Sequence, residues 1–249
     1  MLSKAQISLI TSLQHKKFRK QQGLFLVEGI KSVQEFISSS YLIHSVYATA
    51  DALAKMGILP KNLKYQVVSD AEFSKITQLT TPQGVLALVY IPDNSQIDFK
   101  KIAKQHSLVL DDIQDPGNLG TIIRTAEWFG IEHIICSIGT VDAFNPKVVQ
   151  ATMGSLSRVT IHYTPLAPFL EEANLPTFGA LLDGQSIYNT DFQEAGLIIM
   201  GNEGNGIGQD LLPLIQQAVT IPRLGGAESL NVAVATTIFC SELARKKLK

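Results

Sequence analysis

A strand–turn–helix segment near the middle of the chain carries two side chains that could act on a substrate, Asn118 and Arg124. The apolar run Leu108-Val109-Leu110 predicts a strand, and the polar Gly/Pro turn after it predicts an abrupt passage into a helix. Asparagine is a favoured N-cap, so we predict that this helix begins at Asn118, with Arg124 off its apolar stripe. Open α/β sheets bind ligands at the carboxyl ends of strands, where this turn would present an amide and a guanidinium. The alternative is an ordinary turn with a solvated arginine.

A second apolar run, Leu197–Met200, precedes a loop rich in glycine that contains Glu203. The loop glycines that would let the backbone approach a ligand closely are Gly201, Gly204 and Gly206. The loop is not a dinucleotide fingerprint, because Gln209 stands where the third glycine would be needed. We predict that Glu203 holds Asn118 or Arg124 in a fixed pose; the alternative is a solvated loop glutamate.

A third segment lies just before the last predicted helix, which runs from Val232 to about Lys247. A strand-like run at 219–221 leads through a proline and two glycines to Ser229 and Asn231. Serine and asparagine both cap helices, so either side chain could serve only as the N-cap of the last helix.

Together the three segments resemble the three sequence motifs of the SpoU/TrmH family, RNA ribose 2′-O-methyltransferases of the SPOUT superfamily. The matching strings are D-x-x-D-P-G-N-L-G-x-I-x-R, then I-x-G-x-E-x-x-G, then I-P-x-x-G-x-x-E-S-L-N-V-A-V-A, in the family's order. The segment Gly23–Gly29 looks like the opening strand of the family's substrate-binding domain. The resemblance implies S-adenosylmethionine as cofactor, ribosomal or transfer RNA as substrate, a homodimer, and a trefoil-knotted C-terminus.

The resemblance also assigns roles to individual residues. It implies a catalytic set of Asn118, Arg124, Glu203, Ser229 and Asn231. It implies an adenosine pocket lined by Leu182, Met200, Gly201, Gly204, Ile221 and Leu230. A ribose hydroxyl is a poor nucleophile, so the site must position it and stabilise the developing alkoxide. A guanidinium holds its protons too firmly to be an ordinary base, so we expect Arg124 to stabilise charge.

The pattern of predicted elements indicates two domains. Residues 1–91 alternate between helical and strand patterns and predict a small α/β domain, which the resemblance implies is the RNA-binding domain. Residues 92–104 predict a linker, since a proline and polar residues break the pattern at its start. Residues 105–249 predict the catalytic domain, whose six strands alternate with helices; this implies a parallel sheet with helices on both faces.

Charge is distributed unevenly along the chain. The net charge is −1, but residues 1–100 carry 11 basic and seven acidic side chains, whereas residues 101–249 carry 10 and 15. We predict that a basic cluster contacts RNA phosphates; its members are Lys16, Lys17, Arg19 and Lys20. The alternative is a solvated helix end.

The remaining features narrow the class of protein. No apolar run is long enough for a transmembrane helix and no signal-peptide pattern is present, so we expect a cytosolic protein. Cys136 and Cys240 lie in apolar segments and are expected to be free thiols, and the isolated histidines predict no metal site. Two alternatives stay open: a non-catalytic RNA-binding protein with the same fold, and an NAD oxidoreductase, which the failed glycine spacing disfavours.

Overall fold

The computed structural model describes residues 1–248, and the contacts among them divide the chain into two compact units. Unit 1 contains Met1–Pro92 and Asp142–Ser157, and unit 2 contains Asp93–Val141 and the chain from Arg158 onward. A segment from the middle of the catalytic half of the sequence therefore folds as part of the first unit.

Unit 1 is built on a four-stranded mixed sheet in the order β1-β4-β2-β3. Its strands are β1 (Leu24–Glu28), β2 (Ile43–Ala48), β3 (Tyr65–Val67) and β4 (Val85–Tyr90). Its helices are α1 (Lys4–Ser12), α2 (Lys16–Gln22), α3 (Ile30–Ile37), α4 (Ala50–Met56), α5 (Asp70–Phe73) and α8 (Pro146–Ala151), with a 3-10 turn at Ser155–Ser157. All four strands predicted in residues 1–91 are present; β1, β2 and β4 carry the apolar residues that this sheet buries, whereas the short edge strand β3 buries none of its side chains fully.

The segment 142–157 is held in unit 1 by apolar contacts. The ring of Phe144 packs on that of Phe25 in β1, with centroids 4.8 Å apart, and α8 lies against the same strand. Val148 and Leu156 are fully buried. A fragment lacking residues 1–92 would leave these side chains without their partners, which the division into sequential domains did not anticipate.

Unit 2 is built on a six-stranded sheet in which every neighbouring pair is parallel, in the order β10-β8-β9-β5-β6-β7. Its strands are β5 (His106–Leu110), β6 (His133–Cys136), β7 (Thr160–Tyr163), β8 (Thr177–Ser186), β9 (Gly196–Met200) and β10 (Gln217–Thr220). Its helices are α6 (Phe99–Ile102), α7 (Pro116–Trp128), α9 (Leu166–Ala173) and α10 (Val232–Lys247), with a 3-10 turn at Leu212–Leu214. These are the six strands that the sequence predicted.

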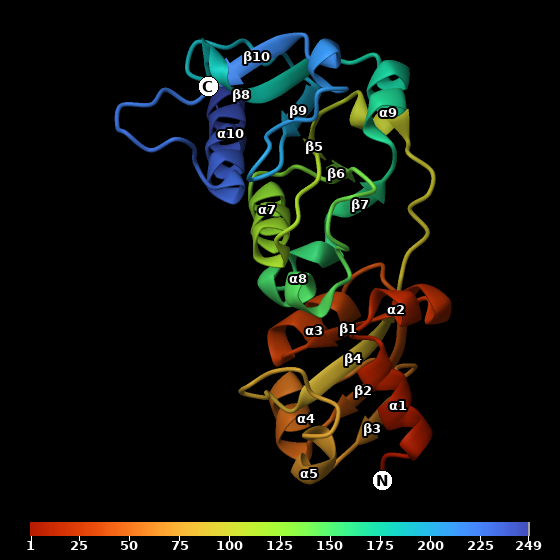
Figure 1. Cartoon of the computed structure of the whole chain (residues 1–249). Helices are drawn as coiled ribbons and strands as arrows, with labels where there is room; N and C mark the ends of the chain where they lie inside the picture. The colour runs from red at the N-terminus through yellow and green to blue at the C-terminus, as the bar shows by residue number, and fades with distance from the viewer. Residues whose placement is uncertain (249) are drawn as a thin grey trace. The chain divides into compact units, whose positions relative to one another are not determined.

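Helices cover both faces of the unit 2 sheet, as predicted. Figure 1 shows α9 on one side of the strands and α7 and α10 on the other, where these two helices pack against each other. Strands β5, β6 and β9 are buried along their whole length, which matches their continuous apolar sequences. The strand order reverses between β5 and β9, so the loops that follow these two strands flank the switch point at which such sheets bind ligands.

Two predictions about this half of the chain have different outcomes. The predicted linker 92–104 is too long, because α6 lies within it: Ile102 is buried in the sheet's core and Phe99 stacks on Phe169 at 5.8 Å. The apolar side chains of α6 are too few to have predicted a helix by periodicity. The trefoil knot concerns threading of the chain rather than its contacts, and it stays a prediction.

Candidate active site

A chain of side-chain hydrogen bonds joins all three sequence motifs at the switch point. Nδ2 of Asn118 donates to Oε1 of Glu203 at 2.8 Å, and Nδ2 of Asn231 donates to Oδ1 of Asn118 at 3.0 Å. The three residues come from the start of α7, the loop after β9 and the start of α10. Both the nitrogen and the oxygen of the Asn118 side-chain amide are therefore held by partners more than eighty positions away in sequence.

The first turn of α7 positions Asn118, but not in the way the sequence suggested. Asp115 is the N-cap: its side chain accepts from the amide of Asn118 at 2.8 Å, and Pro116 occupies the first helical position. Proline is favoured there because its missing N–H would be unpaired in any case. The predicted N-cap at Asn118 is therefore wrong by three residues, which frees the Asn118 side chain to face the other motifs.

The loop after β9 is closed by hydrogen bonds of its own. Oδ1 of Asn202 accepts from the amides of Gly204 and Asn205, and its Nδ2 donates to the carbonyl of Asp112 after β5 at 2.7 Å. A Cβ on Gly201 would lie 2.2 Å from the backbone of Gly206, so the turn requires glycine there. Sequence reasoning missed Asn202, although an asparagine beside a loop glycine is a turn signature that could have identified it.

Asp111 ties the same loop to the end of β5. Its Oδ2 accepts from the amide of Gly208 at 2.8 Å. Partial burial raises the pKa of Asp111, with smaller contributions from the negative charges of Asp210 and Asp112, while the Gly208 amide acts in the opposite direction. Loops after two adjacent strands are thus joined at one edge of the sheet, and Glu203 is carried on a fixed support.

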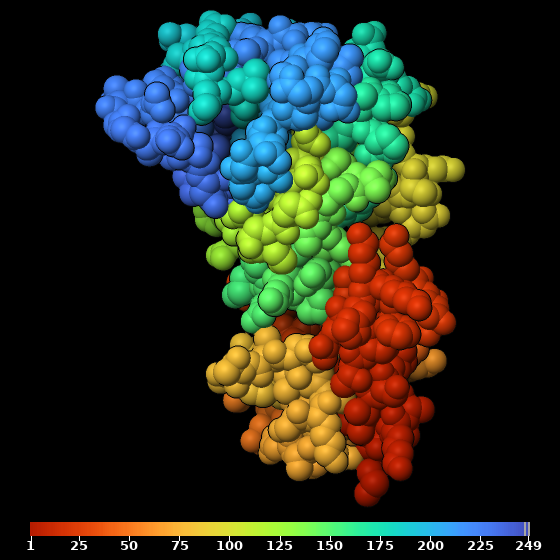
Figure 2. Space-filling model, viewed as in Figure 1, coloured from red at the N-terminus to blue at the C-terminus, as the bar shows by residue number. Residues whose placement is uncertain are grey.

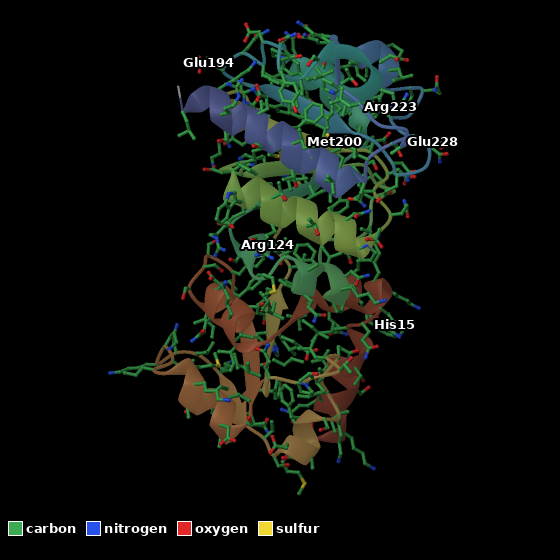
Figure 3. All side chains as sticks on the ribbon, turned by 90° about the vertical axis from the view of Figure 1, so that its left-hand side faces the viewer. His15, Arg124, Glu194, Met200, Arg223 and Glu228 are labelled. Atoms are coloured by element: carbon green, nitrogen blue, oxygen red, sulfur yellow. The ribbon has the colours of Figure 1, made fainter. Side chains whose placement is uncertain are left out.

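Arg124 faces away from this hydrogen-bonded chain. It lies on the exposed side of α7, and its guanidinium makes no hydrogen bond or ion pair with any residue in the described part of the chain. Glu127, three positions further on, is paired with Arg158 at 3.0 Å. Figure 3 shows Arg124 beside α7. Of the two predicted partners of Glu203, the structure brings Asn118 to it and leaves Arg124 available to a ligand.

Ser229 lies in the long connection between β10 and α10. Residues 222–231 are exposed, and Figure 1 shows this connection projecting away from the sheet. Within this connection, Nη1 of Arg223 donates to the carbonyl of Ala227 at 3.1 Å. Asn231 caps α10 by accepting from the amides of Ala233 and Val234, and it also reaches Asn118, so capping and site assembly use the same side chain.

The residues expected to line an adenosine pocket come from the second half of β8, from the end of β9 and the loop after it, and from the connection between β10 and α10. Strand β8 pairs with β9 only as far as Gly179, whereas β9 continues beside β5 to Met200. Met200 is buried, but Leu182 and Leu230 are 72% and 50% exposed. The hydroxyl of Thr220 donates to the carbonyl of Leu182 and holds the diverging part of β8. Uncovered leucines beside backbone polar groups suit a purine nucleoside, which offers an apolar face and a polar edge.

The four basic residues of α2 that were predicted to contact RNA differ in exposure. Lys16, Lys17 and Lys20 are exposed, but Arg19 is 1% exposed and bonds Asp142 at 2.6 Å and the carbonyls of Leu13 and Gln14. A buried and fully paired guanidinium cannot reach an RNA phosphate. The prediction that Arg19 contacts RNA is therefore wrong, because its partner Asp142 lies far away in sequence.

The described residues contain no group of three or more potential metal ligands. Cys136 and Cys240 are free and buried, and burial raises the pKa of both thiols, that of Cys240 to about 12. No helix among residues 1–248 is both long and apolar enough to span a membrane.

A parallel α/β sheet with polar loops crossing its switch point defines a ligand-binding enzyme class, and comparison with known proteins identifies which one. The sequence profile of the SpoU rRNA Methylase family matches residues 105–241, and that of the MRM3-like substrate binding domain matches residues 4–87. The chain belongs to the SpoU family of RNA methylases.

Individual relatives agree over nearly the whole chain. The 23S rRNA (guanosine(2553)-2′-O)-methyltransferase RlmP of Bacillus subtilis is 32% identical over 93% of this chain and 92% of its own. A TrmH-family protein from Porphyromonas gingivalis is 38% identical, with a TM-score of 0.90 and 99% of both chains covered. An rRNA methyltransferase from Sinorhizobium meliloti, solved with AdoMet bound, is 29% identical, with a TM-score of 0.86 over 100% of this chain and 97% of the other. The predicted family and enzyme class are confirmed, and both alternatives are disfavoured.

Proposed function

We propose that this protein methylates the 2′-hydroxyl of a ribose in ribosomal RNA, using S-adenosylmethionine. The observation that carries the proposal is the hydrogen-bonded chain of Asn118, Glu203 and Asn231, which assembles three motifs at the switch point of the sheet. Methylation of RNA is the activity of the family, and ribosomal RNA is chosen because the relatives that align over nearly the full length act on it.

The chemistry needs a ribose oxygen to attack a methyl carbon in line with the bond from that carbon to sulfur, so that the O–C bond forms as the C–S bond breaks and the neutral thioether leaves. Bound S-adenosylmethionine supplies that methyl group on a positively charged sulfonium. The attacking oxygen develops negative charge as its proton is lost, and the site must stabilise it. The exposed guanidinium of Arg124 suits this task and that of holding the adjacent phosphate, because it is a permanent cation with a planar set of donors. The proton then passes to phosphate or water.

The other proposed catalytic residues have distinct tasks. Asn118 and Glu203 hold the start of α7 against the loop after β9, and Asn231 extends this support to α10. Ser229 is exposed and is proposed to bond the target ribose or its phosphate. Residues proposed to hold the cofactor are Leu182 within β8, Met200 at the end of β9, Gly201 and Gly204 in the loop after it, Ile221 just after β10, and Leu230 just before α10.

A transfer assay tests the proposal directly. Purified protein is mixed with S-adenosylmethionine labelled in its methyl group and with ribosomal RNA lacking ribose methylation, and the modified nucleotide is mapped by nuclease digestion and mass spectrometry. We expect one ribose 2′-O-methyl group in the large-subunit RNA, formed equally well in chelator. Methylation of a base, or of transfer RNA only, would contradict the proposal.

We also propose a homodimer that acts in the cytosol. The support is an exposed apolar surface on the paired helices α7 and α10: Trp128 is 81% exposed and Val234 50% exposed. Exposed large side chains of this kind mark interaction surfaces. Light scattering should give twice the chain mass, and a double substitution, Trp128→Glu with Val234→Glu, should give a monomer. A wild-type monomer at micromolar concentration would contradict this proposal.

A further inference from the structure

Helix α2 displays an unusual combination of exposed side chains. Lys16, Lys17 and Lys20 are exposed, and so is the ring of Phe18, at 37%. His15, just before the helix, packs edge-on against Phe18 with ring centroids 6.3 Å apart. Figure 3 shows His15 at the surface of unit 1, and Figure 2 shows the N-terminal segment lying along that surface. One aromatic ring and three cations thus share a helix of seven residues, and a second ring stands at the residue before it.

The helix is held in place from beneath by Arg19. The guanidinium donates to Asp142 through both Nε and Nη2, and to the carbonyls of Leu13 and Gln14 through Nη1. Gly23, in the left-handed conformation, terminates the helix at its C-terminal end. A short helix would be unstable alone, so these contacts are what fix the display of its outer side chains.

The outer side chains occupy two flanks of the helix. Successive residues are rotated by about 100°, so Phe18 and His15 lie on one flank of the helix and Lys17 lies next to Phe18. The other two lysines, Lys16 and Lys20, lie on the opposite flank. No acidic residue occurs before Glu28, and Asp142 is neutralised by Arg19. The helix therefore presents an uncompensated positive surface with an aromatic edge.

We propose that α2 is a site for single-stranded RNA, in which Phe18, supported by His15, stacks on an unpaired base while the three lysines contact the adjacent phosphates. The inference rests on the proposed function and adds to it a recognition element and the form of RNA that is recognised. Bases in a duplex are stacked on one another and offer no free face, whereas an unpaired base gains by stacking on an aromatic ring. A lysine next to the aromatic ring and two more on the other flank of the same helix complement the regular phosphates of a strand that passes over the helix better than an acidic peptide, which has no base to stack.

The test compares two forms of one RNA on the full-length protein. A mixed-sequence single-stranded oligonucleotide and its blunt duplex are titrated separately by fluorescence anisotropy. Phe18→Leu keeps an apolar side chain but removes the ring, so we expect single-strand affinity to fall about five- to a hundredfold and duplex affinity to change less than twofold. Phe18→Tyr should bind the single strand like the wild type.

Matched variants separate stacking from general effects. Tyr65→Leu removes a ring that is 54% exposed on β3, outside the lysine cluster, and should change neither affinity. Replacing the three lysines with glutamine should lower the log–log salt slope for the single strand by up to about 2 units. Unchanged single-strand binding by Phe18→Leu, or an equal loss on both forms, would overturn the proposal.

The two proposals fail in different ways. If the wild type transfers no methyl group to ribosomal RNA but Phe18→Leu loses single-strand affinity, the proposed function is wrong and α2 is still an RNA site. If the wild type methylates RNA and Phe18→Leu binds both forms normally, only the inference about α2 is wrong.

Discussion

Arg19 in unit 1 and Arg124 in unit 2 lie on helices of the same chain and occupy opposite environments. Arg19 is buried and bonds a carboxylate and two carbonyls, whereas Arg124 is exposed and has no partner among residues 1–248. Sequence reasoning assigned both to ligand contact. The difference shows that an acid far away in sequence can turn a basic side chain into part of the buried structure, so that its charge is no longer available to a ligand.

The largest expected effect is on the stability of unit 1. Arg19→Ala leaves the carboxylate of Asp142 and two carbonyls without their donor, so we expect the free energy of unfolding to fall by about 3–5 kcal/mol in a urea titration. The neighbouring exposed Lys17 provides the control: Lys17→Ala should stay within about 0.5 kcal/mol of wild type. Equal stabilities for the two variants would show that burial does not distinguish these side chains.

The second effect falls on catalysis and spares stability. Arg124→Ala should lower the methyl-transfer rate about a hundred- to a thousandfold, because one charge-stabilising donor is lost. Its urea midpoint and its calorimetric affinity for S-adenosylmethionine should match those of the wild type. Arg124→Lys should not restore the rate, since an ammonium lacks the planar fork. A near-normal lysine variant would show that charge alone is sufficient.

A smaller effect is expected at Ser229, which lies in the exposed connection before α10. Ser229→Ala should slow transfer about three- to tenfold, the equivalent of one neutral hydrogen bond, without changing the free energy of unfolding. Ser241→Ala, on the exposed side of α10, is the matched control and should be inert in both assays. A Ser229 variant with an unchanged rate removes this residue from the catalytic set.

The smallest effect is on the pH dependence of stability, and it comes from two buried histidines. His133 and His162 stack at 5.8 Å, and burial lowers both pKa values from 6.5; their mutual repulsion lowers that of His133 further. The negative charges of Glu132 and Asp98 raise the pKa of His133, and the positive charge of Lys101 lowers it. Because the unfolded chain binds these protons more readily, stability should be complete above pH 6.5 and decline as pH falls through the lowered values.

Urea titrations at several pH values between 7.5 and 5 measure this decline. His133→Gln should flatten the pH dependence, whereas His15→Gln, at an exposed position, should leave it as in the wild type. A wild-type stability that does not change across this range would show that the two imidazoles titrate normally when folded.

The sequence by itself determined the strands of both sheets and the family. All ten strands were predicted, because a strand needs only a short apolar run bounded by turn residues, and that information is local. The catalytic motifs were found because loops at the carboxyl ends of strands have little packing to satisfy and carry their chemistry in their residue types.

Only the tertiary structure decided which of these polar residues meet. The N-cap of α7 moved to Asp115 because a proline at the first helical position fits better than a proline before the helix. The partners of Asn118, and the burial of Arg19 by Asp142, join residues 85 to 123 positions apart. Such pairs depend on the order of the strands in the sheet and on how the segment 142–157 packs in unit 1. A local sequence pattern contains neither kind of information, because burial and charge pairing are properties of the folded chain.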